Sequence, residues 1–217
     1  MLSILSHLIK KLTNPVGFVI LLIIYSVSFY LYFFSSYPFS IKNVVAVRPY
    51  DETNERTIAY SPETIYESYF KTGIPDLQIF NSAKDTYKTF TDYGFYGRRA
   101  YEHVLLADII YPTIYGFFYS VLLSLALKKA FPGRPDLMIL NVLPFGATLL
   151  DYVENAAVIQ MIIAFPNKLR NIGSLPGYFT LGKHLFMFLS EAAIAACFII
   201  ALYYSIRGRE AEEETGL

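Results

Sequence analysis

The chain has 217 residues, of which 54% are hydrophobic and 17% aromatic, and its mean hydropathy is +0.39. Eighteen basic and eighteen acidic residues cancel, so no bulk charge points to a nucleic-acid or acidic partner. The single cysteine, Cys197, excludes an internal disulfide and a multi-cysteine metal site. A soluble domain of this size does not need the long apolar runs that this chain carries, so the composition favours a membrane protein.

The first apolar run, residues 16–34, carries no charge and is long enough for one membrane crossing at about 1.5 Å rise per residue. It follows a short N-terminal segment that contains Lys10 and Lys11. A signal peptide is the competing interpretation. The run is longer than the apolar part of a typical signal peptide, and no small-residue cleavage site follows it, so we expect an uncleaved anchor.

Residues 35–102 form the only long polar segment. Aromatic and apolar residues recur through it, which is not typical of disorder. Ser-Pro-Glu at 61–63 predicts the start of a helix that runs to about Lys71. A second helix is predicted from Ser82 to about Gly94, because aromatic residues recur there at helical spacing. We interpret the segment as a small helical cap on one face of the membrane.

Three further apolar segments follow, and Pro112 is expected to kink the first of them. The sequence therefore predicts an all-α membrane protein: a four-helix transmembrane bundle with a small helical extramembrane cap between its first and second helices. The expected division is an N-terminal segment at 1–15, crossings at 16–34, 103–127, 137–165 and 178–204, the cap at 35–102, a basic turn at 128–136, an outer loop at 166–177 and a charged tail at 205–217.

Basic residues near the crossings predict the orientation of the chain. Most of them gather on the side of the N-terminus, namely Lys10, Lys11, Lys128, Lys129, Arg134, Arg207 and Arg209. The short loop on the opposite side carries only Lys168 and Arg170. We therefore expect a multi-pass protein with both termini in the cytoplasm and the cap outside or in a lumen; the sequence does not indicate which membrane holds it.

The third crossing carries polar residues in its middle. Asp151, Glu154 and Asn155 fall at i, i+3 and i+4, so a helix places them on one face. Ionisable side chains at that depth are costly unless they are paired or face a polar interior, which makes them a functional hypothesis. Asp151 and Glu154 are the candidate acid/base residues or cation ligands.

The expected topology arranges the polar residues in two layers that would line a pocket under the cap. The outer layer holds Asp108, Lys183 and His184, and the middle layer holds Asp151, Glu154, Asn155 and Glu191. The candidate ligand-binding residues are Arg98, Asp108, Asn155, Lys183, His184 and Glu191. Purely structural roles stay open for each of these residues. Asp108 could cap a helix or form an ion pair, Lys183 could extend to the headgroups, and His184 could be an interior histidine. The acids could form a network that locks the helices.

Motifs of known chemistry are absent from the sequence. His103, His184 and Asp108 could supply three ligands, but no HxxxH or ExxH spacing supports a metal site, and we predict neither a metal nor a cofactor. The chain has no Gly-rich phosphate loop, no GxSxG and no Ser–Lys motif. No enzymatic activity can be assigned from the residues.

Several short motifs resemble those of a group of four-helix membrane proteins that has no assigned activity. In this group a YSP…GR..Y…D..YP..Y block precedes a D..EN helix, and a proline and a basic residue follow, here Pro166 and Lys183. The matching residues are Tyr60-Ser61-Pro62, Gly97-Arg98, Tyr101, Asp108, Tyr111-Pro112, Tyr115, Asp151 and Glu154-Asn155. The resemblance implies the four-crossing fold and the grouping of the polar residues, and it implies no activity.

Three functions are compatible with the sequence, and we favour the first over the second by a narrow margin. The first is a polar pocket that binds or processes a membrane lipid or small amphiphile. The alternative is a structural or accessory subunit whose polar residues lock the helices and whose cap binds a partner protein in the membrane. The third, conduction of ions or protons along the acidic stripe, is less favoured because a single small bundle without an internal repeat is unlike known transporters.

Overall fold

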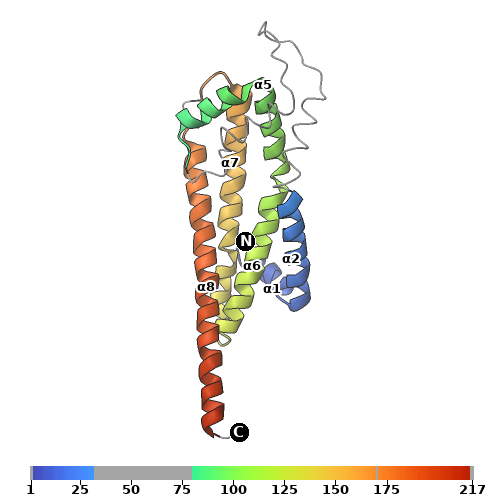
Figure 1. Cartoon of the computed structure of the whole chain (residues 1–217), viewed down its shortest axis with the longest axis vertical. Helices are drawn as coiled ribbons and strands as arrows, with labels where there is room; N and C mark the ends of the chain where they lie inside the picture. The colour runs from blue at the N-terminus through green and yellow to red at the C-terminus, as the bar shows by residue number, and fades with distance from the viewer. Residues whose placement is uncertain (1, 32–79, 170, 216–217) are drawn as a thin grey trace. The chain divides into compact units, whose positions relative to one another are not determined.

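The computed structural model describes residues 2–31, 80–169 and 171–215. Every regular element in these residues is a helix, as the sequence predicts. The elements are α1 (Leu2–Leu12), α2 (Pro15–Tyr30), α5 (Ala83–Ala107), α6 (Ile110–Ala130), the 3₁₀ helix η3 (Pro135–Val142), α7 (Pro144–Ala164) and α8 (Leu175–Thr215) (Figure 1). The helix predicted from residue 61 to Lys71 lies outside the described residues, as does the end of the predicted first crossing.

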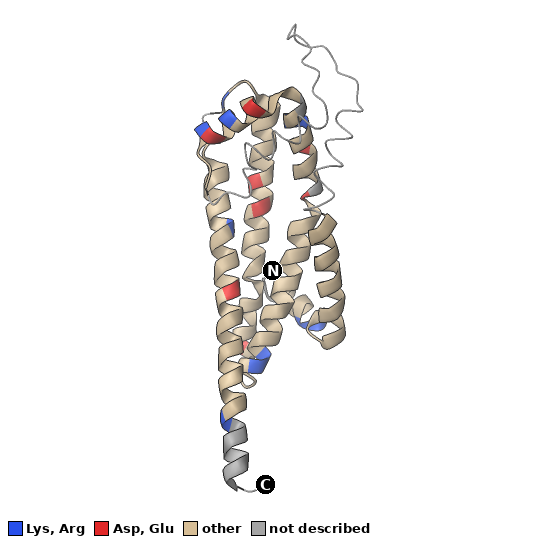
Figure 2. Cartoon of the chain, in the orientation of Figure 1, with Lys and Arg blue, Asp and Glu red and all other residues tan. Residues whose placement is uncertain are grey.

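Three helical segments are long and apolar enough to cross a membrane. They are Ile110–Ala130, Pro135–Ala164 and Leu175–Arg207. Helices α1 and α2 pass the same test together, but they are bent by 97°, so they give a fourth candidate only if they count as one broken span. Figure 2 shows few charged residues along α2, α6 and α7 and more of them on α5. These helices indicate a multi-pass membrane protein.

The N-terminal segment contains a helix, α1, and the residues between α1 and α2 explain why the two are separate. Pro15 has no N–H to continue α1, and it stands at the first position of α2, where none is required. Asn14 caps α2, since its Oδ1 accepts a hydrogen bond of 2.8 Å from the N–H of Gly17. The bend between α1 and α2 therefore follows from the Asn-Pro pair.

The predicted second helix of the polar segment is confirmed as the first part of α5. The Ser82 hydroxyl accepts a hydrogen bond of 3.2 Å from the N–H of Asp85. It also donates to the Asp85 carboxylate, which lowers the pKa of that carboxyl. Gly94 then interrupts the helix with φ 64° and ψ −173°, a conformation that only glycine adopts at low cost. A second helical segment continues to Ala107, beyond the expected cap boundary at 102.

The helix of the predicted second crossing begins later than the expected residue 103, because the chain breaks between α5 and α6. Asp108 and Ile109 form a turn, and α6 starts at Ile110. Pro112 gives the physical reason: it has no N–H for the carbonyl of Asp108, and its ring crowds that carbonyl. The helix is therefore interrupted before the proline. The Tyr152 hydroxyl donates to the Ile109 carbonyl at 2.8 Å and satisfies one backbone group at the break.

The helices of the predicted third and fourth crossings also differ from the expected bounds. The third, expected at 137–165, starts with η3 and continues as α7 from Pro144. The helix of the fourth, expected at 178–204, starts earlier and is longer, since α8 runs from Leu175 to Thr215, and the candidate span within it is Leu175–Arg207. Helix-favouring glutamates in the charged tail are compatible with this extension.

The chain divides into two compact units. Unit 1 comprises Met1–Tyr25, Thr113–Thr148 and His184–Leu217, and unit 2 comprises Ser26–Pro112 and Leu149–Lys183. The core of unit 1 joins α6, η3 and α8 through side chains that include Leu123, Leu127, Met138, Ile194 and Cys197.

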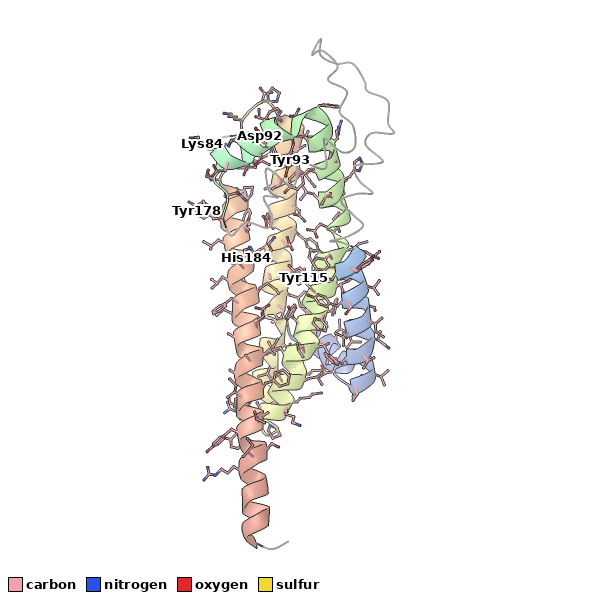
Figure 3. The ribbon with its side chains drawn as sticks, viewed as in Figure 1. Lys84, Asp92, Tyr93, Tyr115, Tyr178 and His184 are labelled. Carbon is pink, nitrogen blue, oxygen red and sulfur yellow. The ribbon has the colours of Figure 1, made fainter. Side chains whose placement is uncertain are left out.

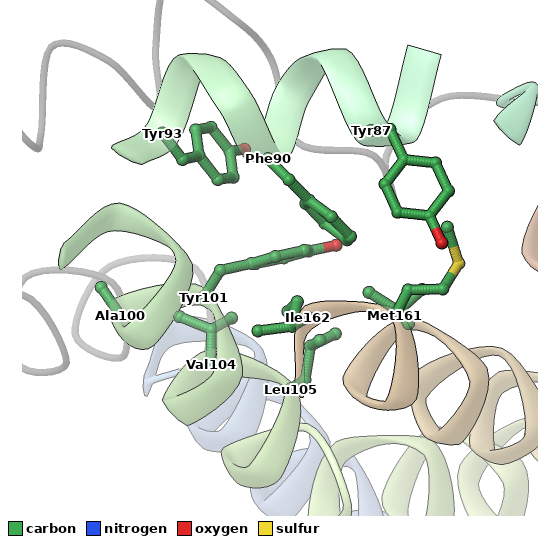
Figure 4. Packing of buried hydrophobic residues seen from close by; sticks show 10 residues of the cluster. Tyr87, Phe90, Tyr93, Ala100, Tyr101, Val104, Leu105, Met161 and Ile162 are labelled. Carbon is green, nitrogen blue, oxygen red and sulfur yellow. The ribbon is translucent and has the colours of Figure 1, made fainter. Parts of the chain in front are cut away.

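The core of unit 2 forms where both segments of α5 meet α7. Tyr87, Phe90 and Tyr93 of the first segment point toward the second segment and α7 (Figure 4). Tyr101 of the second segment and Met161 of α7 are fully buried beneath them. The rings of Tyr93 and Tyr101 meet edge to face with centroids 5.8 Å apart. This cluster fixes α7 against α5, and α7 carries the polar residues described below.

Replacement of Gly94 by Ala should destabilise the protein by about 1–3 kcal/mol, because a side chain at this φ and ψ is strained. The measurement is chemical denaturation of the protein in detergent micelles, followed by circular dichroism. Gly133→Ala is the matched control, since a Cβ at Gly133 would meet nothing within 4 Å. Equal stabilities of the two variants would contradict the assigned conformation of Gly94.

Candidate functional site

One face of α7 buries three polar side chains in unit 2. Asp151, Glu154 and Asn155 retain only 5%, 2% and 4% of their exposed surface. They share a face because they are spaced at i, i+3 and i+4 along a regular helix. Burial of this kind requires partners, since an uncompensated charge in an apolar interior is very costly.

The partners come from the first turns of α8. Thr180 and Lys183 are spaced at i, i+3 and are also buried. Lys183 meets Asp151, and Thr180 meets Glu154, so residue numbers fall along α8 as they rise along α7. This is the register of antiparallel neighbouring helices. A Cβ at Gly182 would lie 2.7 Å from Cδ1 of Leu150, so the glycine allows the two helices to approach closely here.

Lys183 is the common partner of both acids. Its Nζ lies 3.0 Å from Oδ1 of Asp151 and 2.8 Å from Oε2 of Glu154. An ammonium group carries enough protons to donate to both carboxylates. The three side chains are almost fully buried, so the attraction is little screened by water, and removing one partner leaves an uncompensated charge.

Thr180 completes the contacts of Glu154. Its Oγ1 lies 2.5 Å from Oε1 of Glu154 and 2.9 Å from the carbonyl oxygen of Pro176. The shorter distance is typical of a hydroxyl that donates to a carboxylate. The group of Asp151, Glu154 and Lys183 holds two carboxyl groups for one ammonium. When both acids are ionised, the group therefore carries one negative charge in excess.

A second polar pair lies in the same unit. Nδ2 of Asn155 donates to Oδ2 of Asp108 at 2.9 Å, and both side chains are buried. Asp108 occupies the break between α5 and α6, so this bond connects the break to α7. Oδ1 of Asn155 is buried and has no hydrogen-bond partner among the described residues.

Arg98, a predicted ligand-binding residue, contributes to the packing of α5. Its Nη1 donates to the carbonyl of Phe90 at 2.8 Å, which connects the two segments of the helix across Gly94. Its guanidinium also lies over the ring of Phe165, 4.1 Å from the centroid. The partial burial of Arg98 is therefore explained by contacts with neighbouring residues of unit 2.

Two predicted residues, His184 and Glu191, belong to unit 1. Figure 3 places His184 on α8 and Tyr115 on α6. Glu191 is exposed, and the hydroxyl of Tyr119 lies 3.4 Å from its Oε1. The described contacts thus bring together Asp151, Glu154 and Lys183, and separately Asp108 and Asn155.

Two residues that contact the site or its neighbouring backbone, Thr180 and Tyr152, are not among the candidates predicted from the sequence. A signal for Thr180 exists: its i, i+3 spacing with Lys183 repeats the spacing of Asp151 and Glu154 on the neighbouring antiparallel helix. No comparable signal marks Tyr152, because its role depends on where the backbone breaks.

Within residues 2–31, 80–169 and 171–215, no group of three or more His, Cys, Asp or Glu side chains is arranged to hold a metal ion. The chemistry that the described geometry offers is a neutralised ion pair, with one additional carboxyl group that can hold a proton or a cation.

Replacement of Lys183 by Met should destabilise the protein by about 3–5 kcal/mol, because two buried carboxyl groups lose their only cation in the trio. Denaturation in detergent micelles measures this loss. The control is Asp136→Asn, which removes the carboxylate of the exposed Arg134–Asp136 pair at the same distance of 2.8 Å and should cost less than about 1 kcal/mol. Similar losses in both variants would show that burial adds nothing to the Lys183 contacts.

Comparison with known proteins gives no family assignment. No family model, no curated protein and no solved structure matches the chain. The resemblance of its motifs to four-helix membrane proteins therefore remains a resemblance of pattern.

Proposed function

We propose that the chain is a structural or accessory membrane subunit in which Lys183, Asp151 and Glu154 lock α7 to α8. The observation that carries this proposal is the position of Lys183, which lies within 3.0 Å of both acids. Together with the Thr180 hydroxyl, it provides contacts for both buried carboxyl groups. A network whose charged groups contact one another favours a role in holding the helices over a role in binding a charged ligand.

A lock of this kind suits a membrane protein. Lipid tails are as apolar as leucine side chains, so helices in a bilayer associate through close packing and polar contacts. The contact between α7 and α8 has both features, namely the Lys183 network and the close approach at Gly182. The second polar pair, Asp108 with Asn155, extends the lock to the end of α5.

The proposed topology has four crossings. Residues 16–34 form the first crossing, residues 35–102 form a cap on the outer or luminal face, and both termini lie in the cytoplasm. The basic residues near the crossings support this orientation. The cap is the surface through which such a subunit would bind a partner protein in the membrane.

The second candidate function is the binding of a lipid or small amphiphile at the same network. Two observations favour it: the excess of carboxyl groups over ammonium groups, and the buried Oδ1 of Asn155, which has no partner among the described residues. Because Lys183 is already engaged by two acids, the ligand that suits this site carries a cationic or hydrogen-bond-donating headgroup. The same excess charge is the feature that proton or ion movement would use.

Replacement of Glu154 by Gln separates the two candidates. The variant keeps one carboxylate for one ammonium, so the structural proposal predicts a loss of about 1–3 kcal/mol, smaller than that of Lys183→Met. Native mass spectrometry should show the same bound lipids in the wild type and in the variant. A retained amphiphile that disappears in a Glu154→Gln protein of unchanged stability would contradict the structural proposal and support a ligand site.

A further inference from the structure

A pocket of about 300 Å³ lies in unit 1 where three segments meet. These segments are the last turn of α1, the last turn of α6, and the turn that leads from α6 into η3. Lys10, Lys128 and Arg134 provide its charged lining, and Phe131, Pro135 and Met138 contribute to its apolar lining. No acidic side chain of the described residues lines it. The pocket therefore combines positive charge with an apolar wall.

The contacts around the pocket hold two of the basic groups in place. The Nζ of Lys128 donates to the carbonyl of Thr13 at 3.3 Å, which ties the end of α6 to the residue that follows α1. Arg134 is oriented by Asp136, with Nε 3.0 Å from Oδ1 and Nη2 2.8 Å from Oδ2. This pair does not use Nη1, whose N–H groups can donate to a ligand.

The third basic group, Lys10, is positioned by the packing of α1. The Ser6 hydroxyl donates to the carbonyl of Met138 at 3.2 Å, and the side chain of Ile9 is completely buried. In addition, Nδ2 of Asn141 donates to the hydroxyl of Ser124, which joins η3 to α6 at 3.0 Å. The backbone of all three walls is therefore fixed, although the lysine heads are exposed.

The position of the pocket in the chain indicates its environment. It lies at the turn between two segments that are long and apolar enough to cross a membrane, Ile110–Ala130 and Pro135–Ala164. Helix α1 is bent by 97° from α2, and it exposes Ile4, Leu8 and Leu12 along one stripe. An amphipathic helix with lysines at its end is typical of a segment that lies in the plane of the membrane interface.

We propose that this pocket binds the phosphate group of an anionic membrane lipid. Three basic side chains converge on it, and the exposed Asp136 offsets only one of them. A phosphate accepts hydrogen bonds from ammonium and guanidinium groups, and basic pockets at the ends of membrane helices suit such headgroups. The apolar wall of Phe131, Pro135 and Met138 suits the glycerol and the first acyl carbons of a lipid. Inorganic phosphate shares the recognised group but would leave that wall uncovered.

The test is native mass spectrometry of the full-length protein, delipidated in detergent and titrated with phosphatidylglycerol, phosphatidylcholine or inorganic phosphate. The pocket variant is Lys10→Gln/Lys128→Gln. The control variant is Lys11→Gln/Lys129→Gln, which removes the same charges from adjacent exposed positions that do not line the pocket. Arg134→Gln is a second pocket variant that leaves the Lys128–Thr13 contact intact.

The proposal predicts that phosphatidylglycerol binds more tightly than phosphatidylcholine. It also predicts a loss of about fivefold in affinity for each pocket charge removed, and about 20-fold for the pocket double variant. The control double variant should change the affinity by less than about threefold. If its two charges contributed as much as the pocket charges, its loss of affinity would equal that of the pocket double variant. Equal losses in the pocket and control variants would overturn the proposal, because the charges would then act as a diffuse field. Binding of inorganic phosphate without binding of phosphatidylglycerol would overturn the assignment to a lipid.

Discussion

The arrangement of unit 2 depends on one constraint, the burial of the Lys183 ammonium between two carboxyl groups. A charge at this depth is tolerated only with close partners, so α7 and α8 must present Asp151 and Glu154 to Lys183 in a single antiparallel register. Sliding either helix by one residue would turn the polar face away and expose charges to apolar surroundings. The close approach at Gly182 is compatible with that register, and Thr180 adds a hydroxyl to it.

A second constraint is the proline that follows the α5–α6 break. Pro112 removes the hydrogen bond that would continue the helix, and the turn that results contains Asp108. Two side chains of α7 form hydrogen bonds with residues at this break. Tyr152 donates to the carbonyl of Ile109, and Asn155 donates to the carboxylate of Asp108. Irregular backbone is stable within an apolar environment only where neighbouring groups satisfy it. The break and the polar face of α7 thus depend on each other.

The sequence was sufficient for features that depend on local rules. The helical class, the apolar segments and a helix that starts near Ser82 and is interrupted at Gly94 all follow from composition and spacing. The pairing of Lys183 with both acids did not follow, because periodicity places residues on a face and does not determine which helix that face meets. The expected depth layers therefore placed Lys183 in the outer layer and Glu191 with Asp151 and Glu154 in the middle layer. In the structure, Lys183 contacts Asp151, and Glu191 lies near Tyr119. The apolar runs did not indicate where the helices are interrupted. The bend at Pro15 and the break before Pro112 lie at prolines, which were the better signal of irregular backbone.

The most direct test of the account is solid-state NMR of the protein in lipid bilayers, with ¹⁵N in the lysine side chains and ¹³C in the aspartate and glutamate carboxyl groups. The account predicts dipolar contacts from the Lys183 nitrogen to both the Asp151 and the Glu154 carboxyl carbons, since the nitrogen lies 3.0 and 2.8 Å from their oxygens. A Lys183 nitrogen that shows contacts to neither carboxyl carbon, and exchanges its protons rapidly with water, would contradict the central claim that this ammonium is the buried partner of both acids.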